Sequence, residues 1–536
     1  MKAAEAMVKC LEMEGVKVVF GYPGAAICPF YDALTHSEIR HILVRQEQNA
    51  GHAASGFARI TNSPAVCIAT SGPGATNLIT AIATAYMDSV PLVIITGQVS
   101  CDQIGRDVFQ EVDITGAVEP FVKHSFLIKD ANSLPEIFKQ AFYIAGTGRK
   151  GPVLIDVPMD IQDININFSY PKNVEIRAYK PSSKGNALQI KRVVEAILKA
   201  KNPLICSGGG VFSANACTEI SQLAKKANIP VITTMMGIGT FPSDSPLNFG
   251  MIGMHGVKSA NYAMTKCDLI LLVGARVGDR AVKSPSFLAE TAKIIHIDID
   301  PAEIGKNIKV NIPVVGDAKL ILAQILEQIP EMSHDEWFSE LEKNRIKPTF
   351  SAALKGFVNP REFISKLSEK LPENTVVTAD VGQNQIWTSN YFKIKQGRFL
   401  TSGGMGTMGY SLPAAVGAKL ADSDAPVVTI CGDGSFQMQM MELGTICQNN
   451  IPIKIIIMTN NRLGMVRELQ TKNFSDNLVA IFLDGSPDFI KLAAAYGIPA
   501  ERISDISEAD EAIDRLISAK TPYLIECQVS PDEPTL

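Results

Sequence analysis

Long hydrophobic runs, paired cysteines and a strong excess of one charge are missing from this sequence of 536 residues. No stretch approaches the roughly 18 consecutive apolar residues that a membrane-spanning helix needs, so we expect no membrane partner. The ten cysteines are scattered singly, without a C-x-x-C pair. This usage argues against a disulfide scaffold or a zinc site and favours the reducing cytoplasm. The net charge of only −5 is spread along the chain and predicts no nucleic-acid partner.

Short apolar runs alternate with helical patterns along most of the chain, which is typical of α/β proteins with parallel sheets. Most of these runs end in glycine or another turn residue. The expected strands are KVVFGYPG, PAVCIATSGPG, PLVIITGQ and GPVLIDVP, then PLICSGGG, PVITTMMG, CDLILLVGAR and KIIHIDID, and finally TVVTADVG, PVVTICGDG, PIKIIIMTNN and PYLIECQV.

Two polar stretches divide these strands into three groups. One runs from about residue 164 to 184 and the other from about Pro348 to Phe357. Their composition indicates linkers. We therefore predict three doubly wound parallel-sheet domains of similar size, at residues 1–165, 186–330 and 356–536.

The first and third domains share a layout without an obvious sequence repeat. Each opens with a helix and a strand, and each later has a glycine-rich turn that leads into a helix: SGPGATNLITAIATA in the first and GGMGTMGYSLPAAVGAKLA in the third. Two similar domains could clamp one ligand between them. Layout alone does not establish a function, so side chains must decide it.

The segment from residue 432 to residue 461, called the 432–461 unit, carries the clearest chemistry. It reads as strand, tight turn, helix and strand, and the two parallel strands must open into the same crevice. Asp433 follows the first strand and Asn460 the second, so a carboxylate and an amide oxygen converge as Mg²⁺ ligands. The amides of Gly434, Ser435 and Phe436 open the helix, where a diphosphate is stabilised.

Gly-Asp-Gly is also common in ordinary turns, and Asn-Asn often simply ends a strand. The complete 432–461 unit is more specific, because it resembles the cofactor motif of the thiamine-diphosphate enzymes, which begins with GDG and closes with NN. The resemblance implies that Asp433 and Asn460 bind Mg²⁺ through their side chains and Arg462 through its backbone carbonyl.

Glu47 provides a second test, in the first domain. Thiamine diphosphate becomes reactive when its aminopyrimidine ring changes tautomer, and a carboxyl group at the ring nitrogen promotes that change. Such a carboxyl should lie where water is scarce. Glu47 follows a strand and opens an Ala/Gly-rich helix. By itself it could be an ordinary first-turn glutamate, but beside the 432–461 unit we interpret it as the catalytic acid, acting on cofactor held by a partner subunit.

Many further segments resemble the large subunits of acetolactate synthase. They include GYPGAAICPFYDAL, RQEQNAGHAASGFAR, TSGPGATN, GQVSCDQIGRDVFQE, GARVGDR, VGQNQIW and NNRLGMV, and the likeness covers nearly the whole chain in order. The resemblance implies decarboxylation of pyruvate and ligation of the hydroxyethyl unit to a second 2-oxo acid. The product would be 2-acetolactate or 2-aceto-2-hydroxybutyrate, in branched-chain amino acid biosynthesis.

The same resemblance assigns site residues by matching positions. Met408 would support the bent cofactor, although methionine is also ordinary core filler. The thiamine-diphosphate set is Glu47, Thr70, Pro73, Asn77, Val381, Gly382, Gln383, Asn384, Gly406, Met408, Gly432, Asp433, Gly434, Ser435, Asn460, Arg462, Leu463, Gly464 and Met465. The substrate set is Phe109, Gln110, Met465 and Leu469.

The middle domain resembles the FAD-binding domain of this family, in which the flavin is structural. A Gly-Gly-Gly turn after a strand allows close approach of a diphosphate, and an acid at a strand end can bind a ribose, but the glycines could also form a simple turn. The implied FAD contacts are Arg149, Gly208, Gly209, Gly210, Thr234, Met254, His255, Gly274, Arg276, Asp279, Arg280, Asp298, Ile299 and Asp317.

Three features depart from the family pattern and concern the choice of second substrate. Leu469 stands where a tryptophan is usual, Met159 where a lysine is usual, and the sequence stops at PDEPTL, before a further C-terminal arm that many relatives carry. The competing hypotheses are a 2-oxo acid decarboxylase that releases aldehyde and a non-catalytic flavoprotein relative. The family also implies a homodimer or homotetramer and a separate regulatory small subunit. Residues 467–489 could form either a mobile lid or a fixed surface loop.

Overall fold

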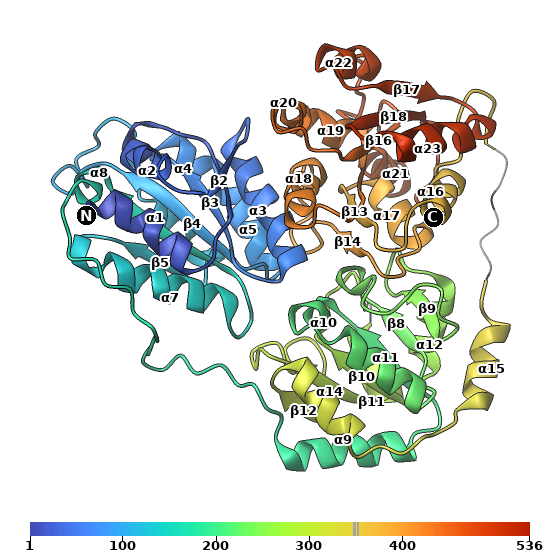
Figure 1. Cartoon of the computed structure of the whole chain (residues 1–536). Helices are drawn as coiled ribbons and strands as arrows, with labels where there is room; N and C mark the ends of the chain where they lie inside the picture. The colour runs from blue at the N-terminus through green and yellow to red at the C-terminus, as the bar shows by residue number, and fades with distance from the viewer. Residues whose placement is uncertain (283, 347–349, 351–352) are drawn as a thin grey trace.

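The computed structural model describes residues 1–282, 284–346, 350 and 353–536, and contains three parallel six-stranded sheets with helices around them (Figure 1). The first sheet has the strand order β2-β1-β3-β4-β6-β5. Its strands are β1 (Val18–Gly21), β2 (Arg40–Leu43), β3 (Ala65–Ala69), β4 (Leu92–Gln98), β5 (His124–Leu127) and β6 (Pro152–Pro158). Its helices are α1 (Ala3–Met13), α2 (Cys28–Leu34), α3 (Glu47–Thr61), α4 (Pro73–Asn77), α5 (Ile79–Met87), α6 (Ile114–Val118), α7 (Leu134–Gly146) and α8 (Met159–Gln162).

The third sheet repeats this topology, with the order β14-β13-β15-β16-β18-β17. The shared layout expected for the first and third domains is therefore an identical strand order. Its strands are β13 (Val376–Ala379), β14 (Arg398–Leu400), β15 (Val427–Gly432), β16 (Lys454–Thr459), β17 (Ala500–Ile503) and β18 (Tyr523–Gln528). Its helices are α16 (Pro360–Lys370), α17 (Gln383–Tyr391), α18 (Ser411–Ala421), α19 (Asp433–Gln439), α20 (Leu443–Gln448), α21 (Gly464–Asn473), α22 (Phe489–Ala495) and α23 (Ala509–Ser518).

The middle sheet is built differently, in the order β12-β11-β10-β7-β8-β9. Numbered from its own first strand and read from the other edge, this is the 3-2-1-4-5-6 order of dinucleotide-binding folds. Its strands are β7 (Pro203–Ser207), β8 (Val231–Thr233), β9 (Asn248–Met251), β10 (Leu269–Val273), β11 (Lys293–Asp298) and β12 (Ile312–Val315). Its helices are α9 (Ala187–Lys199), α10 (Gly209–Ser213), α11 (Cys217–Lys226), α12 (Lys258–Lys266), α13 (Pro285–Thr291), α14 (Ala318–Leu326) and α15 (Asp335–Lys343).

The expected strands are confirmed, but they are mainly the inner strands of each sheet. The strands β5, β9, β12, β14 and β17, which all lie at sheet edges, were not among them. Every residue of β4 and β6 is buried, whereas β5 and β17 are mostly half-exposed. An edge strand is covered on fewer sides, so its sequence lacks the continuous apolar run that indicates a buried parallel strand.

The first and third domains are packed together through α3 and α18 (Figure 1). A methyl group on Gly56 would overlap the carbonyl oxygen of Ala414, and one on Gly417 would overlap that of Ala53. The two helix backbones therefore touch, and any larger side chain at these glycines would force them apart.

A buried ion pair extends this contact. The Arg59 guanidinium lies 2.7 Å from the Asp88 carboxylate and also donates to the Thr401 carbonyl at 2.9 Å. The Asp88 carboxylate in turn accepts from the amides of Gly403 and Gly404. These bonds fix the glycine-rich loop before α18 against the first domain.

In the region of the first expected linker, α8 ends at Gln162, α9 begins at Ala187, and the described residues between them form no helix or strand. The second expected linker, Pro348–Phe357, lies in part outside the described residues. Within the described ranges, no helix is both long enough and apolar enough to cross a bilayer.

Candidate active site

Asp433 and Asn460 lie together at the edge of the third sheet formed by the carboxyl ends of its strands, because they follow the neighbouring parallel strands β15 and β16. The Asp433 carboxylate accepts hydrogen bonds from the amides of Gly434 at 2.9 Å, Asn460 at 3.1 Å and Asn461 at 2.6 Å. Burial raises the pKa of Asp433 to about 6, although these three amides oppose the shift. The strand ends therefore fix one carboxylate in a low-dielectric position.

The Asn460 amide is also fixed. Its Oδ1 accepts from the Arg462 amide at 3.0 Å, and its Nδ2 donates to Oε1 of Gln383 at 3.1 Å. Among the described residues, no lysine or arginine forms an ion pair with Asp433. A buried carboxylate without a cationic partner, beside an amide oxygen, is the donor set that suits Mg²⁺ with phosphate and water completing its coordination.

Glycines let the other predicted cofactor residues approach this edge. A Cβ on Gly434 would lie 2.9 Å from Leu463 and 3.7 Å from Met408, and one on Gly464 would overlap the Gln383 side chain. Asn384 holds its own position by donating to the Ile430 carbonyl at 3.2 Å. Segments that are far apart in the sequence thus meet here: Gly382–Asn384, Met408, Gly432–Ser435, Asn460 and Leu463–Gly464.

Two predicted residues of the third domain show less contact. Val381 donates its amide to the Asp380 carboxylate. A side chain on Gly406, which has a φ of +69°, would meet open space. The left-handed backbone gives Gly406 a conformational reason to be glycine.

The N-terminal half of the predicted site gathers around Glu47, the first residue of α3. Asn77 donates from Nδ2 to Oε2 of Glu47 at 2.9 Å, and a Cβ on Gly74 would lie 3.5 Å from Oε1. The Thr70 hydroxyl, from the end of β3, is buried without a hydrogen-bond partner. Pro73 is the first residue of α4, which ends at Asn77.

Glu47 is partly exposed, whereas the sequence interpretation expected a position from which water is excluded. Within the described residues, no hydrogen bond joins its carboxylate to the 432–461 unit. Part of the Glu47 carboxylate therefore remains accessible in the single chain.

The predicted substrate residues are dispersed in the single chain. Gln110 packs against Gly72, so it lies beside the turn that follows β3. The Phe109 side chain is 86% exposed and the Leu469 side chain 55% exposed. Met465, in the first turn of α21, is half-buried. No described contact brings all four residues together.

Two glycine turns meet in the middle sheet, after the neighbouring strands β7 and β10. A Cβ on Gly208 would overlap the Gly274 carbonyl, and one on Gly210 would lie 2.6 Å from the Gly274 Cα. Dinucleotides bind at the switch point of such a sheet, and β7 and β10 flank it. The predicted residues Thr234, Arg276, Asp279 and Ile299 also follow the carboxyl ends of strands.

Several other predicted flavin residues already have partners. Arg149 pairs with Asp300 at 3.1 Å and Glu303 at 2.8 Å, which ties the first domain to the middle one. Asp317 accepts from the Leu320 amide and thereby caps α14. Arg280 donates to the sulfur of Met254.

The His255 carbonyl accepts from Asn390, which connects the middle domain to α17. Burial lowers the pKa of the His255 imidazole, and the Arg280 charge lowers it further.

His296 was not among the predicted site residues. Its ring is 1% exposed, neither ring nitrogen has a hydrogen-bond partner in the described structure, and Nε2 lies 3.8 Å from the Asp298 carboxylate. Burial raises the pKa of Asp298 to about 6 and lowers that of His296. The alternation in HIDID, which puts both residues on one face of β11, was the available signal.

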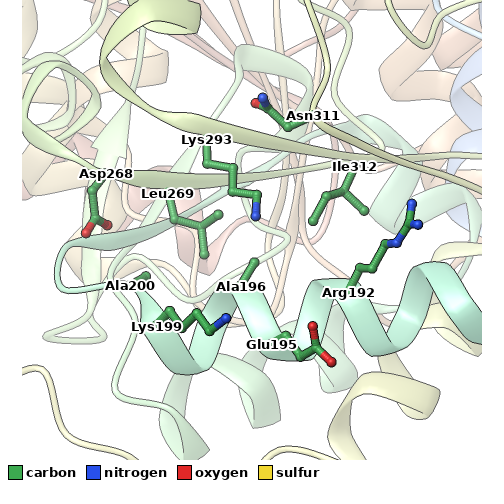
Figure 2. A pocket seen from close by; sticks show the side chains of 10 residues that line it. All are labelled: Arg192, Glu195, Ala196, Lys199, Ala200, Asp268, Leu269, Lys293, Asn311 and Ile312. Atoms are coloured by element: carbon green, nitrogen blue, oxygen red, sulfur yellow. The ribbon is translucent and has the colours of Figure 1, made fainter.

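A separate hollow of about 370 Å³ lies elsewhere on the middle domain (Figure 2). It is lined by Leu269, Lys293 and Ile312, which are the first residues of β10, β11 and β12. Side chains of α9, such as Arg192 and Lys199, also line it. This hollow is at the amino ends of the strands, opposite the end where the glycine turns meet. It is therefore distinct from the candidate site.

Each of the three domains contains a segment that matches a known family of protein domains. Residues 1–117, 190–325 and 380–527 match, respectively, the N-terminal TPP binding domain, the central domain and the C-terminal TPP binding domain of thiamine pyrophosphate enzymes. The chain is 47% identical to a probable acetolactate synthase large subunit of Methanocaldococcus jannaschii, over 99% of this chain and 93% of the relative. This chain belongs to the acetolactate synthase large-subunit family of thiamine pyrophosphate enzymes.

Other members of the family are similar over comparable lengths. The acetolactate synthase large subunit of Buchnera aphidicola (subsp. Schizaphis graminum) is 43% identical over 96% of this chain and 91% of its own length. That of Haemophilus influenzae is 41% identical over 99% of this chain and 95% of its own. These comparisons confirm the family resemblance and the predicted α/β class.

Proposed function

We propose that this chain is the catalytic large subunit of an acetolactate synthase, which decarboxylates pyruvate and joins the resulting two-carbon unit to a second 2-oxo acid. The observation that carries the proposal is the pairing of Asp433 with Asn460 at one sheet edge, in a chain that belongs to this family over nearly its full length. It also belongs in the cytoplasm as part of branched-chain amino acid biosynthesis.

The third domain would hold Mg²⁺ and the diphosphate. Asp433 and Asn460 would supply side-chain oxygens and Arg462 its carbonyl, and the amides at the start of α19 would donate hydrogen bonds to the phosphate. Leu463 and Met408 give the site an apolar wall beside Gly434. Thiamine diphosphate, when bound, supplies the nucleophilic carbon that the side chains of this protein lack.

Glu47 would exchange a proton with the aminopyrimidine nitrogen. Its Oε2 is held by Asn77, and its exposed side is free to meet a ring. As the family resemblance implies, the two halves of the site would meet across a subunit boundary. The active form would then be a homodimer or homotetramer, and a separate small subunit would regulate it.

The middle domain would bind FAD as a structural cofactor. Its dinucleotide-type strand order and the meeting of Gly208 and Gly210 with Gly274 at the switch point support this assignment. The domains are then a pyrimidine-binding domain at 1–165, an FAD-binding domain at 186–330 and a diphosphate-binding domain at 356–536. Purified protein with a flavin absorbance spectrum would support the assignment, and flavin-free protein that is fully active would contradict it.

The reaction is tested with pyruvate, thiamine diphosphate, Mg²⁺ and FAD. We expect acetolactate, measured as acetoin after acid treatment, to be the main product. Acetaldehyde as the main product would overturn the proposal in favour of a decarboxylase. Absence of turnover, with both cofactors bound, would favour a non-catalytic relative.

A further inference from the structure

The last residues of the sequence lie in the third domain, close to the predicted cofactor residue Gln383. The Trp387 indole N–H donates to the Pro534 carbonyl at 3.1 Å, and Arg361 pairs with both the Glu533 carboxylate and the Pro534 carbonyl. Thr535 is only 4% exposed. Residues 533–535, called the strap, are thus fixed on helices α16 and α17.

Glu468 connects the strap to the predicted cofactor residues. One carboxylate oxygen, Oε1, accepts from the Thr535 amide at 2.6 Å, the Thr535 hydroxyl at 2.9 Å and Nε2 of Gln383 at 2.9 Å. Glu468 is four residues after Gly464 in α21, so both lie on the same face of that helix. Gly464 also touches Gln383, because a Cβ there would overlap its amide oxygen.

These contacts determine which way two amide groups point. A carboxylate and a carbonyl can only accept hydrogen bonds, and Nε2 of Gln383 donates to both Glu468 and the Glu533 carbonyl, the latter at 2.7 Å. Oε1 of Gln383 must then point the other way, where it accepts from Nδ2 of Asn460. Oδ1 of Asn460 is left on the opposite side of its own amide, as a metal ligand must be.

We propose that Glu468 is a positioning residue, which fixes the Gln383 and Asn460 amides for Mg²⁺ and is itself held by the strap. The proposal rests on the proposed function, because Asn460 matters here as a metal ligand. Groups that hydrogen-bond metal ligands typically change metal affinity by about 10- to 100-fold when removed. Glu468 acts two hydrogen bonds from the metal, so we expect a loss near the lower end of that range.

The experiment measures Mg²⁺ affinity of the full-length apoprotein at a fixed concentration of thiamine diphosphate. The chain has two tryptophans, so a Trp337→Phe background leaves Trp387 emission to report both cofactor binding and strap docking. Glu468→Leu removes the acceptor at similar size, and Glu468→Gln retains an acceptor oxygen for all three donors. Asp532→Asn is the matched control, because Asp532 pairs only with Arg467 among the described residues and is 85% exposed.

We expect Mg²⁺ affinity to fall about tenfold in Glu468→Leu, and to stay within about twofold of the parent in Glu468→Gln and Asp532→Asn. Deletion of residues 533–536 should reproduce the Glu468→Leu loss and shift Trp387 emission to longer wavelength. Unchanged affinity in Glu468→Leu would overturn the proposal. An equal loss in Glu468→Gln would also overturn it, because charge and not hydrogen-bond direction would then be responsible. A parent protein that binds no thiamine diphosphate with Mg²⁺ would instead contradict the proposed function.

Discussion

The first and third domains have the same strand order but treat their key carboxylates in opposite ways. In the third domain, Asp433 is 2% exposed and receives three backbone amides. In the first domain, Glu47 is partly exposed and receives one side-chain donor, from Asn77. The Asp433 carboxylate is held by three backbone amides, which leave one acceptor site on Oδ1 for a cation, whereas the Glu47 carboxylate keeps most of its acceptor sites available.

The two environments suit the two carboxylates to different chemistry. A group that is immobilised by backbone amides is suited to hold a cation in a fixed place, because little rearrangement is needed when the ion binds. A group with one exchangeable partner is suited to gain and lose a proton. The same topology therefore serves binding in one domain and proton transfer in the other, and a few side chains at strand ends make the distinction.

Loss of the Asp433 charge should have the strongest effect on cofactor binding. Asp433→Asn retains the size of the side chain but removes its charge, so we expect Mg²⁺ affinity to fall by about 100-fold or more, and activity with it. Equilibrium binding of thiamine diphosphate with Mg²⁺ measures the loss. Near-normal binding in this variant would show that the metal lies elsewhere.

Glu47→Gln should impair proton transfer and leave cofactor binding intact. We expect turnover of pyruvate to fall by about 10²- to 10⁴-fold, the usual contribution of a general acid or base. Binding of thiamine diphosphate should change by less than about threefold, because the diphosphate and metal are held by the other domain. Loss of binding together with turnover would mean that Glu47 has a structural role.

Acidification should act on the binding half through Asp433, whose pKa burial raises to about 6. Mg²⁺ requires the ionised carboxylate, so affinity should decline as the pH falls through about 6, approaching tenfold per pH unit below it. The stability of the apoprotein should change in the opposite direction. As the pH falls, protonation of Asp433 should stabilise the fold, because the folded state holds this proton more tightly than the unfolded chain does.

Calorimetric Mg²⁺ titrations between pH 5 and 8, in the presence of thiamine diphosphate, measure the dependence on pH. Asp433→Glu is the control that retains a titratable carboxyl. If affinity were flat across this range, Asp433 would not be the group that competes with protons for the metal.

Loss of the hydrogen bond from Asn77 to Glu47 should have a weaker effect on turnover. Asn77→Ala removes the single side-chain donor to its carboxylate, a bond to a charged group at a partly exposed position, so we expect turnover to fall about five- to tenfold. Steady-state kinetics at saturating cofactor measure it. Asn132→Ala is a matched exposed-asparagine control in the same domain and should leave turnover unchanged.

The sequence was sufficient to predict the inner strands and the proximity of Asp433 to Asn460. Asp433 and Asn460 follow continuous apolar runs, and parallel neighbours necessarily bring their ends together. The edge strands β5 and β17 could not be recognised in the same way, because half-exposed residues do not form such runs. The strand order 3-2-1-4-5-6 of the middle sheet also required the structure, since the order of strands in space leaves little local trace.

Glu468 and His296 were missed for a different reason. Glu468 gains its importance from Thr535 and Gln383, which are 67 and 85 residues away in the sequence. Contacts at such separations depend on tertiary packing and have no local pattern. His296 lies in an ordinary apolar strand pattern, and its nearly complete burial beside Asp298 becomes visible only when its neighbours are known.

The close contact between α3 and α18 has a mechanical consequence. Glu47 is the first residue of α3, and the loop with Met408 leads directly into α18. Because no space separates the backbones of α3 and α18 at Gly56 and Gly417, a displacement of Glu47 at the start of α3 would be transmitted to the loop that carries Met408.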